Sequence, residues 1–166
     1  KELVLKQLPE LKTSQVLLEP LRRNTAPCIA YASYKILTIN PDANIIVAPS
    51  DHLIQQEDAF IDVIKKGLDF TSRKDALLTL GITPNRPETG YGYIQVENSD
   101  PTGDFENLHK VKTFTEKPDL QLAQIFLDSG EFFWNSGIFI WSLKVILKAL
   151  EEHLSPVSDL FKKGCK

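Results

Sequence analysis

The sequence predicts a three-layer α/β domain. Short apolar, β-branched segments alternate along the chain with longer amphipathic segments, which is the order of strands and helices in such a fold. With 166 residues, of which 42% are hydrophobic and 25% charged, the chain is long enough to bury a substantial core. Polar clusters follow several of the predicted strands, and open α/β sheets bind their ligands at such positions.

The most informative segment is residues 45–52, where an apolar run ends in Pro-Ser-Asp-His. Residues 45–48 are too few for a helix, and their β-branched character predicts a parallel strand that is buried on both faces. Pro49 cannot donate a ladder hydrogen bond, so we expect the strand to end there. Asp51 then follows the strand, where a carboxylate can hold a divalent metal against phosphate oxygens. The alternative is that Asp51 caps the next helix, a common role for aspartate.

Three elements are predicted on the N-terminal side of that strand. They are the end of a helix in residues 1–11, a short strand at 15–19 that stops at Pro20, and a helix over 27–37. Asn24 and Thr25 are both good N-caps for this helix, and Pro27 suits its first turn. Small and apolar residues recur along the helix at the spacing of a packing face.

The alternation continues on the C-terminal side. We expect helices at 57–72, 119–127, 142–153 and from 155 onward, and strands at 76–82, 91–96, 108–115 and 133–141, with a turn-rich excursion at 98–103. On the first of these helices, Phe60, Ile61, Ile64 and Leu68 form one apolar stripe. Asp119 caps the second helix, and Ser129 and Gly130 end it.

Five polar clusters lie at or near the ends of these strands. They cover residues 22–25, 49–52, 88–93, 116–118 and 135–137. Each has a structural alternative: Pro-Glu-Thr-Gly is a common turn, Asn-Ser-Gly suits a bulge in an aromatic strand, and the charged clusters suit solvated surface. Their recurrence at one position of the fold favours a ligand-binding rim.

Composition argues against several functional classes. The net charge of −3 gives no nucleic-acid footprint, and no apolar run approaches membrane-spanning length. Cys28 and Cys165 make neither a disulfide framework nor a metal cluster, and the sequence has no signal peptide, so we expect a cytoplasmic protein. The sequence contains no methionine, and we expect it to be an excerpt of a longer chain.

Five motifs together resemble those of the mannose-1-phosphate guanylyltransferases, a family of the sugar nucleotidyltransferase superfamily. They are Arg-Asn-Thr-Ala-Pro (23–27), Val-Ala-Pro-Ser-Asp-His (47–52), Pro-Glu-Thr-Gly-Tyr-Gly-Tyr-Ile (87–94), Glu-Lys-Pro (116–118) and Trp-Asn-Ser-Gly (134–137). The resemblance implies a Rossmann-like nucleotidyltransferase fold with a mixed central sheet, incomplete at both ends. Residues 1–166 would then be part of one catalytic domain.

The resemblance also implies an activity and a set of site residues. GTP and mannose 1-phosphate would give GDP-mannose and pyrophosphate with Mg²⁺ as cofactor, in a homo-oligomer that binds neither nucleic acid nor membrane. The implied catalytic residues are Asp51, the metal ligand, and Lys117, which would pair with the sugar phosphate. The implied nucleotide-binding residues are Glu19, Arg23, Asn24, Thr25, Pro49 and Ser50. The implied sugar-phosphate residues are Gly90, Tyr91, Gly92, Glu116, Lys117, Asn135 and Ser136.

Several family features have no counterpart in these residues. The glycine-rich phosphate loop that opens the family's domain and a second metal-binding aspartate are missing, and Arg22 stands where glycine is expected. We therefore expect the 166-residue chain alone to lack transferase activity. Two alternatives stay open: another sugar nucleotidyltransferase, and a non-catalytic regulatory subunit that binds nucleotide sugars. Asp51 and Lys117 are both present, which favours an enzyme.

Overall fold

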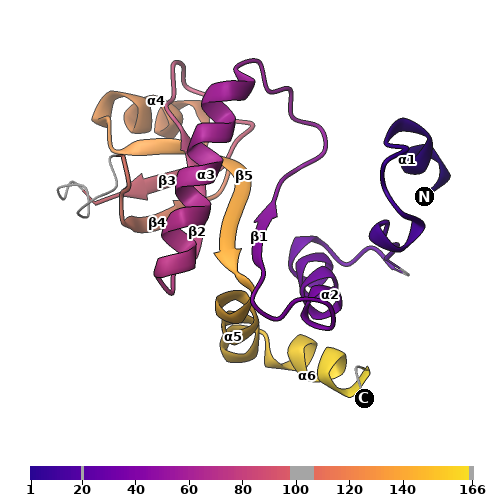
Figure 1. Cartoon of the computed structure of the whole chain (residues 1–166). Helices are drawn as coiled ribbons and strands as arrows, with labels where there is room; N and C mark the ends of the chain where they lie inside the picture. Colours follow the sequence, from indigo (N-terminus) through magenta and orange to yellow (C-terminus); the bar gives the residue numbers. More distant parts are fainter. Residues whose placement is uncertain (20, 98–106, 165–166) are drawn as a thin grey trace. The chain divides into compact units, whose positions relative to one another are not determined.

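The computed structural model describes residues 1–19, 21–97 and 107–164, which form two compact units. The helical unit comprises residues 1–43 and 143–166, and the sheet unit comprises residues 44–142. Helices and strands alternate along the chain, as the predicted α/β class requires (Figure 1). Pro20, Cys165 and the predicted excursion at 98–103 lie outside the described residues. No helix of the described ranges is both long and apolar enough to cross a membrane.

The helical unit packs three helices against one another. Its elements are α1 (Glu2–Gln7), the 3-10 helix η1 (Thr13–Gln15), α2 (Thr25–Leu37), α5 (Leu143–His153) and α6 (Ser155–Gly164). Helices α2, α5 and α6 contact each other. The Tyr34 hydroxyl lies 2.7 Å from Ser158 Oγ in a buried contact, and Phe161 stacks on Tyr34 at 5.4 Å between ring centroids. The packing face of α2 therefore includes a tyrosine besides the small residues that the sequence indicates.

The strand predicted at residues 15–19 is wrong. Gln15 closes the short helix η1 instead, because its side-chain Oε1 accepts a hydrogen bond from Lys12 N at 2.8 Å and its own N–H donates to Lys12 O at 2.9 Å. Residues 16–19 adopt no regular element. An apolar run forms a strand only where another strand pairs with it, and the described part of the helical unit supplies none.

Strand β5 is the centre of the sheet unit. The strands are β1 (Asn44–Val47), β2 (Leu78–Ile82), β3 (Tyr93–Val96), β4 (Val111–Thr115) and β5 (Phe132–Ser142). β5 pairs with β1, β2 and β3, and β3 pairs with β4. Ile140 is matched by both Ile46 and Leu78, so β1 and β2 lie on opposite edges of β5. Every pairing among the described strands is antiparallel, so these strands do not form the mixed sheet that the resemblance implies.

The pairing of β1 corrects the prediction for residues 45–48. A parallel strand covered on both faces was expected there, but β1 runs antiparallel to β5, and Ile46 is 41% exposed. A short β-branched run predicts a strand without fixing its direction, because direction is decided by a partner far away in the sequence. β1 and β2 nevertheless run in the same direction on the two edges of β5.

Two helices build the core of the sheet unit. From α3 (Glu57–Arg73), Ile64 packs with Ile138 and Ile140, and Phe60 and Leu68 join that cluster. From α4 (Leu120–Ser129), Ala123 and Phe126 pack with Tyr93 and Trp134. The predicted stripe of α3 is confirmed except at Ile61, which is 45% exposed. Ile61 lies at the margin of the stripe, one position from Phe60.

The ends of α4 follow the predicted signals. Asp119 Oδ1 accepts a hydrogen bond from Leu122 N at 2.8 Å, and Gly130 adopts a left-handed conformation with φ of 68° at the C-cap. A side-chain oxygen at the N-cap satisfies an N–H that has no partner within the helix, and glycine takes the left-handed conformation with little steric cost. Both boundaries are therefore fixed by local chemistry.

Removing the cap should lower stability measurably. We expect Asp119→Ala to reduce the free energy of unfolding by about 1 kcal/mol, and Asp119→Asn to be nearly neutral because asparagine is an equally good N-cap. Urea unfolding of the chain measures both. Asp128→Ala, near the other end of α4, removes only a hydrogen bond from Gln124 and should cost less than ~0.5 kcal/mol. Equal losses for the two alanine variants would contradict the capping role.

Candidate functional site

Adjacent strands bring three of the predicted polar clusters together within the sheet unit. Asn135 N donates to Gly92 O at 2.8 Å, and Asn135 is matched with Gly81 on the other edge of β5. A Cβ atom at Gly92 would lie only 3.3 Å from Thr115 O, the carbonyl just before Glu116 and Lys117. The loop at residues 90–92, the end of β4 and the start of the Asn-Ser-Gly motif therefore lie side by side.

The Asn-Ser-Gly motif is a bulge in β5, as its structural alternative predicted. The register between β2 and β5 shifts there, and side chains replace the missing ladder bonds. Ser136 Oγ donates to Leu80 O at 2.7 Å and accepts from Ile138 N at 3.1 Å. Asn135 Oδ1 accepts from Gly137 N at 3.0 Å, which leaves the side-chain NH₂ as the group that Asn135 can offer a ligand. Bulges often redirect side chains next to binding sites, so the structural and functional interpretations are compatible.

The end of β1 lies against this bulge. Gly137 has φ of 71°, and a Cβ atom there would lie 3.3 Å from Pro49 Cγ. Ser50 and Asp51 follow Pro49 in an exposed turn. The N-cap position of α3 is occupied by Gln56, several residues further on, so the alternative that Asp51 caps this helix is wrong.

Asp51 is a single carboxylate and not part of a metal cluster. Among the described residues, no group of three or more His, Cys, Asp or Glu side chains is placed to hold a metal ion. Mg²⁺ usually keeps several water ligands and takes one or two carboxylates together with substrate phosphates. An exposed lone carboxylate fits that kind of shared site, and it does not fit a cage built only from protein ligands.

Glu116 and Lys117 are exposed between two fixed points of the chain. β4 ends at Thr115 on one side, and the buried Pro118 with the N-cap Asp119 follows on the other. Within the described ranges, Lys117 takes part in none of the ion pairs. Its ammonium group is therefore free to bind an anion, while the backbone on both sides holds its position.

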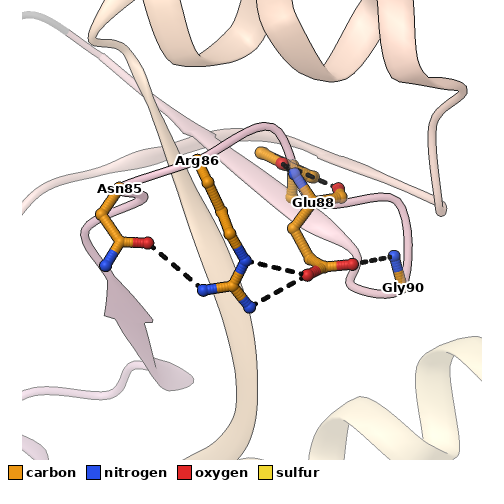
Figure 2. Close-up of polar contacts among 5 residues, drawn as sticks. Asn85, Arg86, Glu88 and Gly90 are labelled. Carbon is orange, nitrogen blue, oxygen red and sulfur yellow. Dashed lines mark hydrogen bonds and ion pairs between the residues drawn. The ribbon is translucent and has the colours of Figure 1, made fainter.

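Sequence reasoning missed how the loop before β3 is held. The Tyr93 hydroxyl donates a hydrogen bond to Glu88 O at 2.9 Å and accepts one from Glu88 N at 3.0 Å. One carboxylate oxygen of Glu88 accepts from Gly90 N at 2.9 Å, and the other accepts from Arg86 Nε at 3.2 Å and Nη2 at 3.0 Å (Figure 2). The Gly90 N–H first, and Arg86 second, lower the pKa of the Glu88 carboxyl. Glu88 is therefore ionised at neutral pH.

Trp134 underlies the same loop. Its side chain is 7% exposed, and the guanidinium carbon of Arg86 lies 5.2 Å from its ring centroid. The Tyr91 ring meets it edge-on at 5.4 Å. The sequence offered one signal for the bond between Glu88 and Gly90, which is a glutamate two residues before a glycine in a proline-containing loop. It offered none for the stacking of Arg86, which depends on Trp134 of the distant strand β5.

The other predicted nucleotide-binding residues belong to the helical unit. Helix α2 begins at Thr25, and Asn24 occupies its N-cap with φ of 69°. The Asn24 side chain makes no capping hydrogen bond. Glu19 lies beside Cys28. The pKa of the Cys28 thiol is raised mainly by partial burial and to a lesser extent by the Glu19 carboxylate. Glu19 and residues 23–25 thus gather at the start of α2, while Pro49 and Ser50 belong to the sheet unit.

Known proteins resemble the chain in sequence. Mannose-1-phosphate guanylyltransferase of Salmonella montevideo is 41% identical over 134 residues, which cover 78% of this chain and 28% of that protein. The xanthan biosynthesis protein XanB of Xanthomonas campestris pv. campestris strain B100 is 39% identical over 160 residues, covering 95% of this chain and 33% of that protein. The chain thus spans about a third or less of the length of these relatives.

Solved structures resemble the fold. A Thermus thermophilus protein named mannose-1-phosphate geranyltransferase matches with a TM-score of 0.80 at 26% identity, covering 90% of this chain and 42% of that one. A Helicobacter pylori protein named mannose-6-phosphate isomerase matches with a TM-score of 0.77 at 36% identity, covering 99% and 59% respectively. These matches confirm the predicted fold class.

The description of one protein family fits nearly the whole sequence. The nucleotidyl transferase family matches residues 2–166, which include all five motifs and both compact units. The chain therefore belongs to the nucleotidyl transferase family.

Proposed function

We propose that the complete protein is a mannose-1-phosphate guanylyltransferase, which makes GDP-mannose and pyrophosphate from GTP and mannose 1-phosphate. One observation carries the proposal. The loop at residues 90–92, the Glu-Lys-Pro motif and the Asn-Ser-Gly bulge lie side by side in a chain of the nucleotidyl transferase family. Relatives named mannose-1-phosphate guanylyltransferase support the choice of sugar and nucleotide.

The proposed reaction is an in-line displacement. A phosphate oxygen of mannose 1-phosphate attacks the α-phosphorus of GTP, and the bond from that phosphorus to the oxygen bridging the β-phosphate breaks as pyrophosphate leaves. Lys117 binds the sugar phosphate through a charge-assisted contact. Glu116 accepts hydrogen bonds from mannose hydroxyls, and Asn135 donates to them. The protein's contribution is positioning and charge stabilisation, as in phosphoryl transfer generally.

A metal ion and the nucleotide complete the proposed site. Asp51 is the proposed Mg²⁺ ligand, and the ion would neutralise phosphate charge in the bound substrates. Pro49 and Ser50 are the proposed contacts of GTP within the sheet unit, and the nucleotide-binding role of Glu19 and residues 23–25 stays a prediction. The cytoplasmic location and the homo-oligomeric state stay predictions, as does the lack of activity in the isolated 166-residue chain.

A substrate panel tests the proposal. The complete protein, offered GTP, ATP, UTP or dTTP with mannose 1-phosphate or glucose 1-phosphate, should release pyrophosphate fastest from GTP with mannose 1-phosphate. A clear preference for UTP or dTTP with glucose 1-phosphate would favour another enzyme of the superfamily. Tight binding of GDP-mannose without turnover of any pair would instead favour the regulatory subunit.

Neutralising Asp51 should abolish most of the turnover. In the complete protein, we expect Asp51→Asn to lower kcat by about 100-fold or more, because a metal ion at the phosphates contributes several kcal/mol of charge stabilisation. Asp62→Asn removes an exposed carboxylate of α3 and serves as the matched control. Near-normal rates of Asp51→Asn at saturating Mg²⁺ would remove Asp51 from the metal site.

A pair of glycine variants separates strain from site geometry. Gly130 and Gly137 both have φ near 70°, so alanine at either position should cost ~1–2 kcal/mol of stability. Only at Gly137 does the new Cβ meet a neighbour, Pro49, whose displacement would move the segment that carries Asp51. We expect Gly137→Ala to lower kcat about tenfold more than Gly130→Ala does. Equal effects on turnover would show that the contact with Pro49 is irrelevant to activity.

A further inference from the structure

The loop at residues 84–92 contains an ion pair to which the proposed reaction assigns no role. The base of the loop does not need it. The Tyr93 side chain is fully buried, and its hydroxyl already binds both the N–H and the carbonyl of Glu88. This main-chain anchor would persist without the Glu88 carboxylate.

The two carboxylate oxygens of Glu88 have different partners. One accepts from Gly90 N at 2.9 Å, and the other accepts the two donors of Arg86 (Figure 2). A Cβ atom at Gly90 would lie 3.2 Å from the first oxygen, so glycine permits this close approach. The carboxylate thus connects Arg86 to the tip of the loop, just before residues 91 and 92.

Stability alone gives a poor account of this ion pair. The side chains of Arg86 and Glu88 are 56% and 26% exposed, and ion pairs at the surface contribute only about 0–1 kcal/mol. Arg86 is nevertheless oriented on two sides: its Nη1 donates to the side-chain Oδ1 of Asn85 at 3.4 Å, and its guanidinium lies over the face of Trp134. A planar guanidinium held by stacking and by a forked hydrogen bond has a well-defined position.

We propose that Glu88 and Arg86 are positioning residues that hold the backbone of residues 90–92 in the conformation that receives the sugar phosphate. This inference rests on the proposed function. Neither side chain touches the substrate. Their effect is to order the loop before binding, which lowers the entropy cost that a ligand must otherwise overcome. Trp134 transmits the position of β5 to the loop, because it stacks with Arg86 and immediately precedes Asn135.

Binding measurements on the complete protein test the inference without requiring turnover. Isothermal titration gives dissociation constants for mannose 1-phosphate and for GTP in the wild type and in Glu88→Ala, Glu88→Gln and Arg86→Ala. We expect Glu88→Ala to raise the dissociation constant of mannose 1-phosphate on the order of tenfold and to change that of GTP by less than about twofold. Glu88→Gln keeps an oxygen for the Gly90 N–H and should lie between Glu88→Ala and the wild type.

The control is a second exposed ion pair of the sheet unit. Arg73 binds Asp69 at 2.6 Å within α3, and Arg73→Ala should alter neither dissociation constant. Melting temperatures measured in parallel detect a general loss of structure, which would weaken the binding of both ligands together. If Glu88→Ala weakened the binding of both ligands equally, or if Arg73→Ala caused the same change, the positioning role would be wrong. The proposed function would not be affected. A wild-type protein that does not bind mannose 1-phosphate would overturn the proposed function and the inference with it.

Discussion

The sheet unit depends on the pairing of β5 with strands on both of its edges. Ile140 is matched on one side by Ile46 and on the other by Leu78, and Trp134 is matched by residues of β2 and β3. The Tyr93–Trp134 cluster and the Ile64–Ile140 cluster each include residues of β5. The bulge of β5 lies between these two regions, and the hydroxyl of Ser136 preserves hydrogen bonding where the register shifts. The strand that organises the core therefore also organises the candidate site.

The parts of this fold that were predictable from sequence are those with local causes. Helix α4 has a capping aspartate, a left-handed glycine and an apolar face within one short segment, and its bounds agree closely with the prediction. The direction of β1 has no local cause, because it depends on the distant strand β5. At residues 15–19 the bonding of Gln15 to Lys12 forms η1, and the described part of the helical unit supplies no strand to pair with the rest. The exposure of Ile61 was not predictable for a similar reason. Helical spacing identifies the apolar face of a helix, but it does not show how wide a part of that face other elements bury.

The candidate site divides in the same way. Polar clusters at strand ends were visible in the sequence, and the antiparallel pairing of β3 with both β4 and β5 brings three of them together. Sequence alone leaves the capping role of Asp51 open, and the structure excludes it because the N-cap of α3 is Gln56, five residues further along the chain. The stacking of Arg86 was not apparent in the sequence because it depends on Trp134, which lies in the distant strand β5. The metal and substrate roles of the predicted residues stay predictions.

The charged groups of the candidate site are exposed, and this affects how it can act. Asp51, Glu116 and Lys117 all face solvent, where water and salt weaken the attraction between an isolated charge and a phosphate. Such charges become effective when bound substrates exclude water around them, so the proposed site must first hold a substrate through backbone contacts. The groups that can do so are the bulge of β5 and the loop at residues 90–92, where Gly90 is bonded to Glu88 and Glu88 in turn to Tyr93. In the proposed reaction, backbone geometry therefore selects the sugar phosphate before the charges stabilise the transferring group.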